Sequence, residues 1–387
     1  MNTRRTFLKQ AALLGTTTTL PLHHLFAQGA GSAQPVGDGR FAEKYENIRR
    51  AKKPPRKITI PDAGEYKVIK GDFHMHTLFS DGHVMPRDRV LEAVDNGLDV
   101  IAITDHIEYR PNFGGSRLKL ADKNDDYNIS YSLAKAEAEQ NNLILALGTE
   151  ITKPARHFNA LFLKDVNQIA AVVNDWRAML AVAAEQGGFI QWNHPHRINQ
   201  DPVKDPNGLS AGEPMRFFEE HEELWQKGHL HGVEVFNGAS LFPIALEWCN
   251  ERDLAPITIS DIHPSEWNTY GHQNLLRPMT LVLANERSHD SIREAFLAKR
   301  TIGWAANMIL GRQPWVEKLF RACVAIKKTG TALEITNRSD IPCYIEKDNE
   351  TVELQLDASL TFSNAPKTLV VSNWFVGMKK PLEIDVE

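Results

Sequence analysis

The sequence predicts an α/β fold with a mainly parallel sheet that closes into a barrel, followed by a small all-β domain. From about Tyr66, apolar runs of strand length alternate with helical patterns through seven or so units, which is typical of a parallel barrel. After residue 310 the pattern changes to closely spaced short strands with Asn, Asp, Gly and Pro turns. This second pattern favours a β-sandwich of about 70 residues. We therefore expect a barrel at 60–310 and a β-sandwich at 311–387.

Residues 1–28 have the features of a twin-arginine export signal. The paired Arg4 and Arg5, followed by Phe7 and Lys9, stand in the register of that motif. The weakly apolar run that follows is too short and too rich in threonine for a spanning helix of about 20 apolar residues, and no later segment reaches that length. A disordered basic tail is the alternative. We expect passage through the twin-arginine (Tat) translocon to the periplasm or the outside of the cell, and no stable membrane span.

Residues 29–59 predict a linker with a short charged helix, and the barrel follows. Apolar runs predict barrel strands at 68–75, 98–104, 143–148, 158–163, 188–193, 232–237 and 255–260. Helical spacing of apolar residues predicts helices at 86–97, 129–140, 165–186, 213–227, 242–253 and 288–300. The C-terminal strands are expected at 323–330, 332–338, 343–348, 352–356, 360–364, 367–375 and 382–387.

Composition and charge exclude several classes of protein. Of the 387 residues, 42% are hydrophobic and 24% charged, which is typical of a globular chain rather than a disordered or fibrous one. The formal net charge is -5 and no basic stripe is present, so we expect no nucleic-acid binding. The three cysteines, Cys249, Cys323 and Cys343, have no CxxC spacing. Cys323 and Cys343 are expected either to pair after export or to be two unpaired core thiols.

Side chains that bind metals occur at the carboxyl ends of the predicted strands, where α/β enzymes place their catalytic groups. His74 and His76 point the same way, because side chains two residues apart share one face of a strand. The candidate ligands are His74, His76, Asp81, His106, Glu150, His157, His194, Asp261 and His263. This mixture of His, Asp and Glu favours Zn, Mn or Fe. The candidates exceed the needs of one ion, so the sequence predicts a centre of two or three divalent ions with Glu150 as a bridge.

The order of these motifs resembles that of the PHP (polymerase and histidinol phosphatase) family. The resemblance lies in HMHT with SDG, ITDH, GTE, RHFNALFL, NHPH and SDIH, over about residues 66–305. It implies a distorted (β/α)7 barrel and a trinuclear metal centre. The three implied ion sites are His74, His76, Glu150 and Asp261; Glu150, His157 and His194; and Asp81, His106 and His263. Asp81 stands where many members of the family have His, which makes the third site harder.

The resemblance also implies a metal-dependent phosphoesterase. We expect a metal-bridging hydroxide to attack phosphorus, with Glu150 as the bridge and His196 assisting the leaving group. The residues that flank the ligand segments, and so are candidates for binding a small phosphate ester, are Arg110, Lys153, Arg197 and His272. A plain surface role is the alternative for each. A phosphodiester substrate is favoured slightly over a monoester. The alternative functions are C–N hydrolysis of the amidohydrolase type and a noncatalytic metal-binding module.

Several other residues carry weaker signals. Asp105 is expected either to orient His106 or to cap the following turn. The histidines that fit no motif, and that we expect to face solvent, are His83, His221, His229, His231 and His289. The aromatic residues expected to dock the C-terminal strands against the barrel are Trp315, Phe320, Trp374 and Phe375.

Overall fold

The structure, a computed structural model, describes residues 55–112, 126–152, 156–195 and 215–386. The expected export signal at 1–28 and the linker up to residue 54 lie outside the described residues, as do Lys153, His196 and Arg197. The described residues belong to one compact unit, Pro55–Glu387. None of the helices that these residues form is both long enough and apolar enough to cross a membrane.

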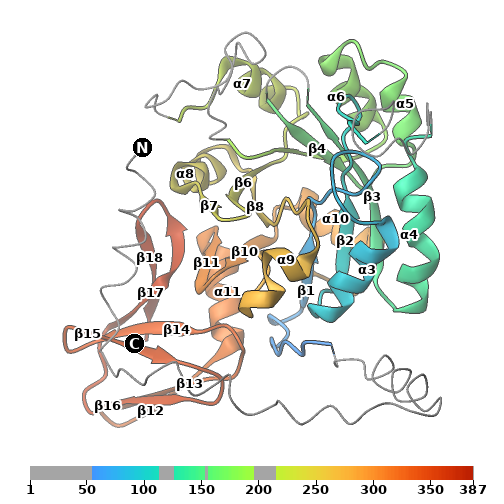
Figure 1. The fold of residues 1–387 in the computed structure, drawn as a ribbon. Helices are drawn as coiled ribbons and strands as arrows, with labels where there is room; N and C mark the ends of the chain where they lie inside the picture. The colour runs from blue at the N-terminus through green and yellow to red at the C-terminus, as the bar shows by residue number, and fades with distance from the viewer. Residues whose placement is uncertain (1–54, 113–125, 153–155, 196–214, 387) are drawn as a thin grey trace, which may run out of the picture. The chain divides into compact units, whose positions relative to one another are not determined.

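The described residues form one sheet of 15 strands and a second sheet of three. The strands of the large sheet up to residue 311 (Figure 1) are β1 (Lys67–Asp72), β2 (Val100–Ile103), β3 (Ile144–Ile151), β4 (Phe158–Leu161), β5 (Phe189–Trp192), β6 (Gly232–Asn237), β7 (Ser240–Leu241), β8 (Ala255–Ile259), β9 (Met279–Ala284), β10 (Thr301–Ala305) and β11 (Met308–Gly311). Their order is β11-β10-β9-β1-β2-β3-β4-β5-β6, and β7 and β8 both pair with β6.

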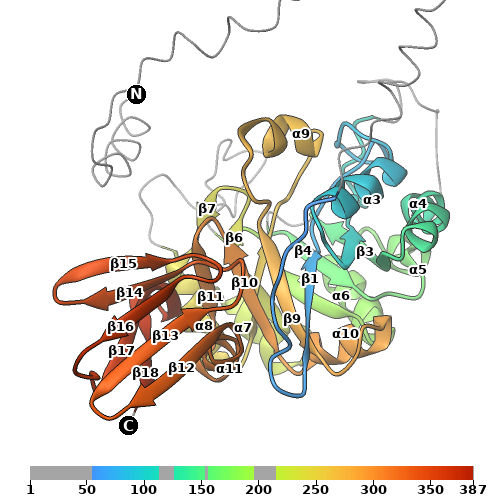
Figure 2. The ribbon, with the colours of Figure 1, turned by 90° about the horizontal axis from the view of Figure 1, so that it is seen from below.

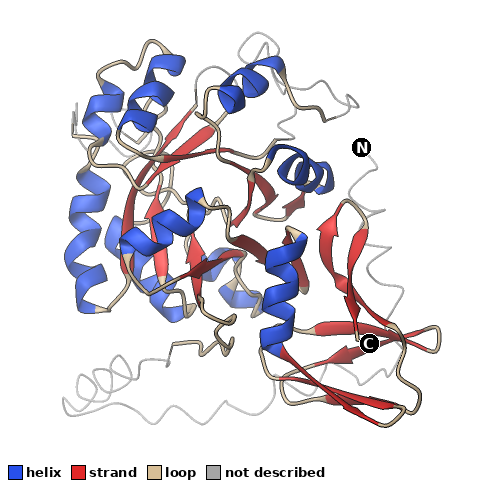
Figure 3. Cartoon of the chain, turned by 180° about the vertical axis from the view of Figure 1, so that it is seen from behind, coloured by secondary structure: helices blue, strands red, loops and turns tan. Residues whose placement is uncertain are grey.

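Helices connect these strands and lie around the outside of the sheet (Figure 3). They are α3 (Pro86–Asp95), α4 (Ile129–Gln140), α5 (Val166–Ala170), α6 (Trp176–Glu185), α7 (Glu219–Gln226), α8 (Pro243–Arg252), α9 (Glu266–Thr269), a 3-10 turn (Gly271–Gln273), α10 (His289–Leu297) and α11 (Gln313–Cys323). The helix predicted at 165–186 is divided into α5 and α6. The reason is that the Asp175 side chain accepts hydrogen bonds from the N–H groups of Arg177 (2.9 Å) and Ala178 (3.2 Å), which starts a new helix.

The large sheet contains both parallel and antiparallel strands up to β9. β1, β2 and β3 are parallel, as are β5, β6 and β8. β4 runs antiparallel to β3 and to β5, which departs from the expected parallel order. Only residues 152–157 separate β3 from β4, and a parallel crossover needs about a dozen residues or more. β9, which was not expected from the sequence, pairs antiparallel with β1.

The chain just beyond β1 lies against the chain just beyond β8. Met75 and Ile262 form an isolated parallel bridge. The hydrogen bonds from His76 N to Ile262 O and from Asp261 N to His74 O each measure 3.0 Å. Among the described residues β1 and β8 share this isolated bridge and no paired ladder, so complete closure into a barrel is not confirmed. The contact nevertheless brings the predicted ligands at the ends of β1 and β8 together.

The described residues after α11 form strands only, as expected for an all-β segment. They are β12 (Val324–Thr329), β13 (Ala332–Asn337), β14 (Cys343–Lys347), β15 (Glu350–Leu354), β16 (Ser359–Phe362), β17 (Thr368–Gly377) and β18 (Lys380–Asp385). β12, β13 and β16 make the small sheet, whereas β14, β15, β17 and β18 join the large one (Figure 2). Helix α11, which precedes these strands, was not expected from the sequence.

The C-terminal strands are joined to the rest through β11 and β17. These two strands are parallel, with Ile309 opposite Trp374 and Leu310 opposite Phe375. Trp374 is fully buried and packs edge-on against Phe320, with the ring centroids 5.6 Å apart. The apolar core around Trp374 also includes residues of β1, β9, β10 and α11, so the expected aromatic docking is present. Both cysteines that could have paired, Cys323 and Cys343, are buried free thiols.

Candidate metal centre

The predicted ligands lie together at the edge of the sheet where the parallel strands end. His157 comes just before β4, and because β4 is antiparallel, its start lies at the same edge as the ends of its neighbours. Asp81 is in the loop after β1. Three sets of side chains could each hold an ion: His74, His76 and Asp261; Glu150, His157 and His194; and His76, Asp81, His106 and His263.

The first set, with Glu150, has the spacing of ligands around a tetrahedral ion. The Nε2 atoms of His74 and His76 are 3.1 Å apart, and each lies 3.3 Å from Glu150 Oε2. Asp261 Oδ1 lies 3.3 Å from His74 Nε2 and 3.2 Å from His76 Nε2. Ligand atoms about 2.05 Å from a tetrahedral zinc ion lie about 3.3 Å from one another. Five of the six edges of such a tetrahedron therefore have the expected length.

Glu150 reaches the second set through its other oxygen. Glu150 Oε1 lies 2.8 Å from His157 Nδ1 and 3.4 Å from His194 Nε2. Asn193 Nδ2 donates a hydrogen bond of 2.9 Å to the same oxygen. The two carboxylate oxygens of this fully buried residue thus face different groups of imidazoles. This is the arrangement expected of a carboxylate that bridges two ions.

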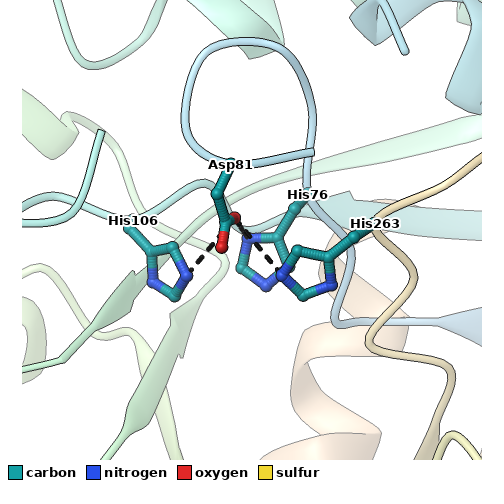
Figure 4. A group of neighbouring side chains, drawn as sticks. All are labelled: His76, Asp81, His106 and His263. Carbon is teal, nitrogen blue, oxygen red and sulfur yellow. Dashed lines mark ion pairs between the residues drawn. The ribbon is translucent and has the colours of Figure 1, made fainter. Parts of the chain in front are cut away.

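The third set surrounds the carboxylate of Asp81, as Figure 4 shows. Asp81 Oδ1 lies 3.2 Å from His263 Nε2 and 3.5 Å from His106 Nε2. His76 faces this set with its Nδ1 atom, 3.8 Å from Asp81 Oδ1, while its Nε2 atom belongs to the first set. The rings of His106 and His263 stack on His76, with centroids 4.4 Å and 4.3 Å away. The first and third sets therefore meet at the His76 ring.

The carboxylates and imidazoles of the centre stabilise each other's charged forms. Burial alone would lower the pKa of His74, but the charges of Asp261 and Glu150 outweigh burial and raise that pKa well above its usual range. The pKa is raised, against the effect of burial, in His76, His194 and His263 as well. Burial opposes the ionised form of Glu150, yet the positive charge of the histidines, His74 foremost, holds the pKa of Glu150 well below its usual range. Protons and divalent cations therefore compete for these atoms.

Two buried atoms of the centre have no hydrogen-bond partner among the described residues, namely Asp261 Oδ1 and His106 Nδ1. His106 Nδ1 lies 3.0 Å from Glu150 Oε2, but the two atoms are not aligned for a hydrogen bond. A buried polar atom without a partner costs about 1–3 kcal/mol. A divalent cation at the first set would supply the partner for Asp261 Oδ1. The residues of the centre therefore fit the ions that the sequence predicts, and their role as ligands stays a prediction.

Two of these side chains are carried by an uncommon backbone conformation. His194 and Asp261 have φ values of 27° and 50°, in the left-handed region. For a residue other than glycine this conformation costs about 1–2 kcal/mol and persists where the surroundings hold it. The backbone at both positions is therefore fixed by its neighbours.

Arg89 of α3 ties two ligand segments together, which sequence reasoning did not anticipate. Its fully buried guanidinium donates hydrogen bonds to the carbonyl oxygens of His76 (2.9 Å), Ile262 (3.1 Å) and His263 (2.7 Å). The segments that follow β1 and β8 are thus held at a fixed separation. From the sequence, an arginine on an amphipathic helix is expected to face solvent, so no local pattern predicts this role.

Asp105 holds the loop that carries Asp81. Its carboxylate accepts hydrogen bonds from Thr77 N (2.7 Å), Thr77 Oγ1 (2.6 Å) and Ser80 Oγ (2.6 Å), and from the Ser130 hydroxyl. The described hydrogen bonds of this carboxylate therefore go to the loop and to Ser130 of α4 rather than to His106 or to the turn after it, the two roles expected from the sequence.

Glu234 of β6 is a further residue that sequence reasoning missed. It is fully buried, and its Oε1 atom lies 2.8 Å from His74 Nδ1. The signal in the sequence is a single acidic residue inside the apolar run 232–237. A buried charge in a strand requires polar partners, and those partners lie at the centre.

The candidate substrate-binding residues are only partly described. Arg110 Nε donates a hydrogen bond of 2.9 Å to Phe79 O, and its guanidinium lies over the Tyr127 ring, 4.7 Å from the centroid. His272 is exposed in the segment between β8 and β9, with Nδ1 3.0 Å from Trp267 O. Substrate binding by either side chain stays a prediction. The remaining candidates, Lys153, His196 and Arg197, lie outside the described residues.

His221 is buried, so the expectation that it faces solvent is wrong. Helix α7 directs His221 and Leu224, three residues apart, to its buried face. The His221 ring lies against Trp192, with centroids 3.8 Å apart. Burial, with a smaller contribution from Arg156, lowers the pKa of His221 well below its usual range. His83, in contrast, is exposed as expected.

Comparisons with known proteins agree with this geometry. Residues 72–202 match the model of the PHP domain family. The crystal structure of a two-domain protein from Bacteroides vulgatus ATCC 8482, described as containing a predicted PHP-like metal-dependent phosphoesterase, is 32% identical, with a TM-score of 0.74. That match covers 87% of this chain and 99% of the Bacteroides chain. No match was found among the curated proteins.

Two further solved structures are less similar. One is a protein from Bifidobacterium adolescentis ATCC 15703 proposed to be a metal-dependent phosphoesterase, 18% identical with a TM-score of 0.36 over 52% of this chain and 90% of that one. The other is an amidohydrolase from Chromobacterium violaceum with bound sulfate and no metal, 14% identical with a TM-score of 0.36 over 52% of this chain and 90% of that one. Likenesses at this level carry no argument about function.

Proposed function

The chain belongs to the family of PHP-like metal-dependent phosphoesterases, and on that premise we propose that it hydrolyses phosphate esters at a centre of two or three divalent ions. The observation that carries the proposal is the placement of Glu150, whose two oxygens face two separate groups of imidazoles. When bound, such ions supply a nucleophile from water near neutral pH and neutralise charge on the phosphate oxygens. Zn, Mn and Fe all suit the mixed His, Asp and Glu donors.

The side chains of the centre have distinct tasks under this proposal. His74 and His76 direct the lone pairs of their Nε2 atoms to one point, and Asp261 Oδ1 joins them there. Glu150 couples that point to His157 and His194, and Asn193 holds the Glu150 carboxylate by a hydrogen bond to Oε1. This prearranged set of acceptors means that little reorganisation is needed when ions and substrate bind.

For the substrate we propose a small phosphodiester, with monoesters as slower substrates. His196 would assist the departing alkoxide by donating a proton. Residues proposed to bind the phosphate ester are Arg110, Lys153, Arg197 and His272. Support comes from the sequence, in which these residues flank the ligand segments.

Hydrolysis assays on metal-stripped and reloaded protein test the proposed function. With Zn²⁺ or Mn²⁺ restored, we expect turnover of bis(p-nitrophenyl) phosphate and slower turnover of p-nitrophenyl phosphate, and none in the stripped protein. Cleavage of a p-nitroanilide instead of either ester would support C–N hydrolysis. Metal-loaded protein that cleaves no ester and no amide would be a noncatalytic module, and the proposal would be wrong.

We further propose that the chain is exported to the periplasm or beyond through the twin-arginine translocon, on the motif around Arg4 and Arg5. Changing both arginines to lysine should leave folded protein in the cytoplasm, because the motif is an address read by a receptor. Cell fractionation with immunoblotting measures this. Normal export of the Arg4→Lys, Arg5→Lys variant would mean that another route is used.

The seven strands β1, β2, β3, β4, β5, β6 and β8 are also proposed to form the distorted (β/α)7 barrel that the resemblance implies. Support comes from the bridge between Met75 and Ile262, which joins the two ends of this series of strands.

A further inference from the structure

Strand β6 stands apart from its neighbours because none of the predicted ligands follows it. β1, β2, β5 and β8 each lead to at least one of these residues and β3 carries one near its end, whereas β6 contributes two polar side chains, Glu234 and Asn237, from an otherwise apolar run. Glu234 is fully buried. A carboxylate in such a place needs a full set of hydrogen-bond donors, and each donor to Glu234 is identifiable.

Four donors surround the Glu234 carboxylate. Oε1 lies 2.8 Å from His74 Nδ1 and accepts a hydrogen bond of 3.1 Å from Gln191 Nε2. Oε2 accepts hydrogen bonds from the backbone N–H of His194 (2.5 Å) and from Asn237 Nδ2 (2.9 Å). A carboxylate offers about four acceptor sites and no donor, so these contacts fill it.

We infer that Glu234 is a positioning residue of the metal centre, which fixes His74 with Nε2 toward the ions and holds the strained backbone of His194. Because the Glu234 carboxylate only accepts, the Nδ1 atom of His74 carries the proton that lies between them. The lone pair of a neutral His74 is then on Nε2, which lies 3.1 Å from His76 Nε2 and 3.3 Å from Asp261 Oδ1. A carboxylate behind a ligating histidine orients the ring and raises its basicity.

The contact with His194 gives the same carboxylate a second task. His194 has φ 27°, and Glu234 Oε2 accepts its backbone N–H. A backbone in the left-handed region is maintained only where neighbouring groups hold it. Glu234 therefore holds the ring of His74, which belongs to the first set, and the backbone of His194, which belongs to the second set.

A β-bulge in β6 makes this arrangement geometrically achievable. Glu234 and Asn237 are three residues apart, so on a regular strand their side chains would point to opposite faces. The pairing with β8 shifts register between Glu234 and Phe236, because Glu234 is opposite Ile257 and Phe236 is opposite Thr258. Val235 is thus an extra residue, and a bulge of this kind redirects the side chains beyond it. Asn237 consequently bonds both Glu234 Oε2 (2.9 Å) and Asp261 Oδ2 (3.2 Å).

A chain of amides also connects Glu234 with Glu150. Gln191 Nε2 lies 3.1 Å from Glu234 Oε1 and 3.2 Å from Asn193 Oδ1, and Asn193 Nδ2 donates to Glu150 Oε1 (2.9 Å). The two buried carboxylates therefore hold one another's position through two side chains. A substitution at Glu234 should therefore alter the geometry of both the first and the second set.

Glu234→Gln tests the inference, which rests on the proposed metal centre. The amide presents one acceptor and one NH₂ group, so its NH₂ must face either His74 Nδ1 and Gln191 or His194 N–H and Asn237, and donors would then oppose donors. We expect affinity for Zn²⁺ and Co²⁺ to fall on the order of 10- to 100-fold. The visible absorption of Co²⁺-loaded protein, which reports the geometry of ligating nitrogens, should also change. Titration calorimetry and absorption on the full chain measure both quantities.

Two further variants complete the design. Glu247→Gln, at a carboxylate of α8 that accepts the backbone N–H of Met378 between β17 and β18 and is not among the predicted ligands, is the matched control and should bind with wild-type affinity. Asn237→Ala removes one donor to Glu234 and one to Asp261 from a half-buried position, and should cost about tenfold in affinity. If Glu234→Gln does not fold, the Asn237→Ala variant tests the positioning role of Glu234.

The outcomes separate this inference from the proposed function. Folded Glu234→Gln protein with the affinity and Co²⁺ spectrum of the wild type would overturn the positioning role, and so would an Asn237→Ala variant that binds as the wild type when Glu234→Gln is unfolded. Weakened binding in Glu234→Gln, together with a wild type that binds ions but cleaves no phosphate ester, would support the positioning role and refute the hydrolase. A wild type that binds neither ion would overturn both.

Discussion

Replacing Glu150 by glutamine should abolish hydrolysis while leaving the fold in place. The carboxylate has one oxygen toward His74 and His76 and the other toward His157 and His194. Glutamine has one oxygen and one NH₂ group, and NH₂ donates rather than ligates. In either orientation of the amide, one of the two groups of imidazoles loses its shared ligand.

The expected loss in kcat is at least about 100-fold, which corresponds to about 2.7 kcal/mol of transition-state stabilisation. A second effect follows in protein stripped of metal. Glu150 is only 1% exposed and lies among histidines whose pKa it helps to raise. Removing one partner of a buried charge pair costs about 3–5 kcal/mol, so the stripped variant should have a lower free energy of unfolding near pH 6 than the stripped wild type.

Three measurements check this prediction on wild type, Glu150→Gln and the control Glu247→Gln. Elemental analysis gives the number of bound ions, p-nitrophenyl ester hydrolysis gives kcat, and urea unfolding gives stability. We expect at least one ion fewer per chain in Glu150→Gln, and wild-type values in the control. A folded Glu150→Gln protein with the full number of ions and most of its activity would refute the bridging role.

Three other predictions follow from the structure. Asp81→His should keep a ligand between His106 and His263 but shift preference toward zinc, as measured by competition between Zn²⁺ and Mn²⁺; an unchanged preference with lost activity would show that Asp81 does not ligate. The pKa of His74, His76, His194 and His263 is raised in the folded protein, so their ion pairs stabilise the stripped protein fully below the ordinary value of 6.5, and this stabilisation is lost as pH rises through the raised values. The Tm difference between loaded and stripped protein should therefore grow as the pH rises above about 6.5, and a difference that stays constant in calorimetry would contradict this reading. Trp374→Ala should lower the free energy of unfolding by about 3–5 kcal/mol through the cavity it leaves, with the number of bound ions unchanged; a loss of metal in folded variant protein would mean that the C-terminal strands shape the centre directly.

The sequence predicts the position of each candidate ligand because strand ends are visible in it and parallel strands end at one edge. His157 is instructive, since it precedes its strand and reaches the centre only because β4 is antiparallel. The short connection before β4 is visible in the sequence and indicates an antiparallel strand. The repeating pattern of strands and helices favoured a parallel one instead. Helix α11 was likewise signalled by Pro314 and by the helical spacing of Val316, Leu319 and Phe320.

The partners of the supporting residues were beyond sequence reasoning for a physical reason. Arg89 and Glu234 act through groups far away in the chain, and a residue's type says nothing about which distant carbonyl or imidazole it will meet. For His221, in contrast, the sequence contained a pattern that was not used. Without a motif it was expected at the surface, whereas the amphipathic pattern of α7, in which His221 and Leu224 share a face, indicates burial.

The pairing of β11 with β17 has a consequence for how the chain is made. Until β17 is synthesised, β11 is the unpaired edge of the large sheet, with the apolar side chains of Ile309 and Leu310 and a row of free backbone groups. Roughly 65 residues separate Ile309 from Trp374. At bacterial or eukaryotic rates of translation that distance takes about 3 to 13 seconds. During each round of synthesis the nascent chain therefore exposes an aggregation-prone edge strand for this interval. A ribosome-associated chaperone would protect the chain most at that stage.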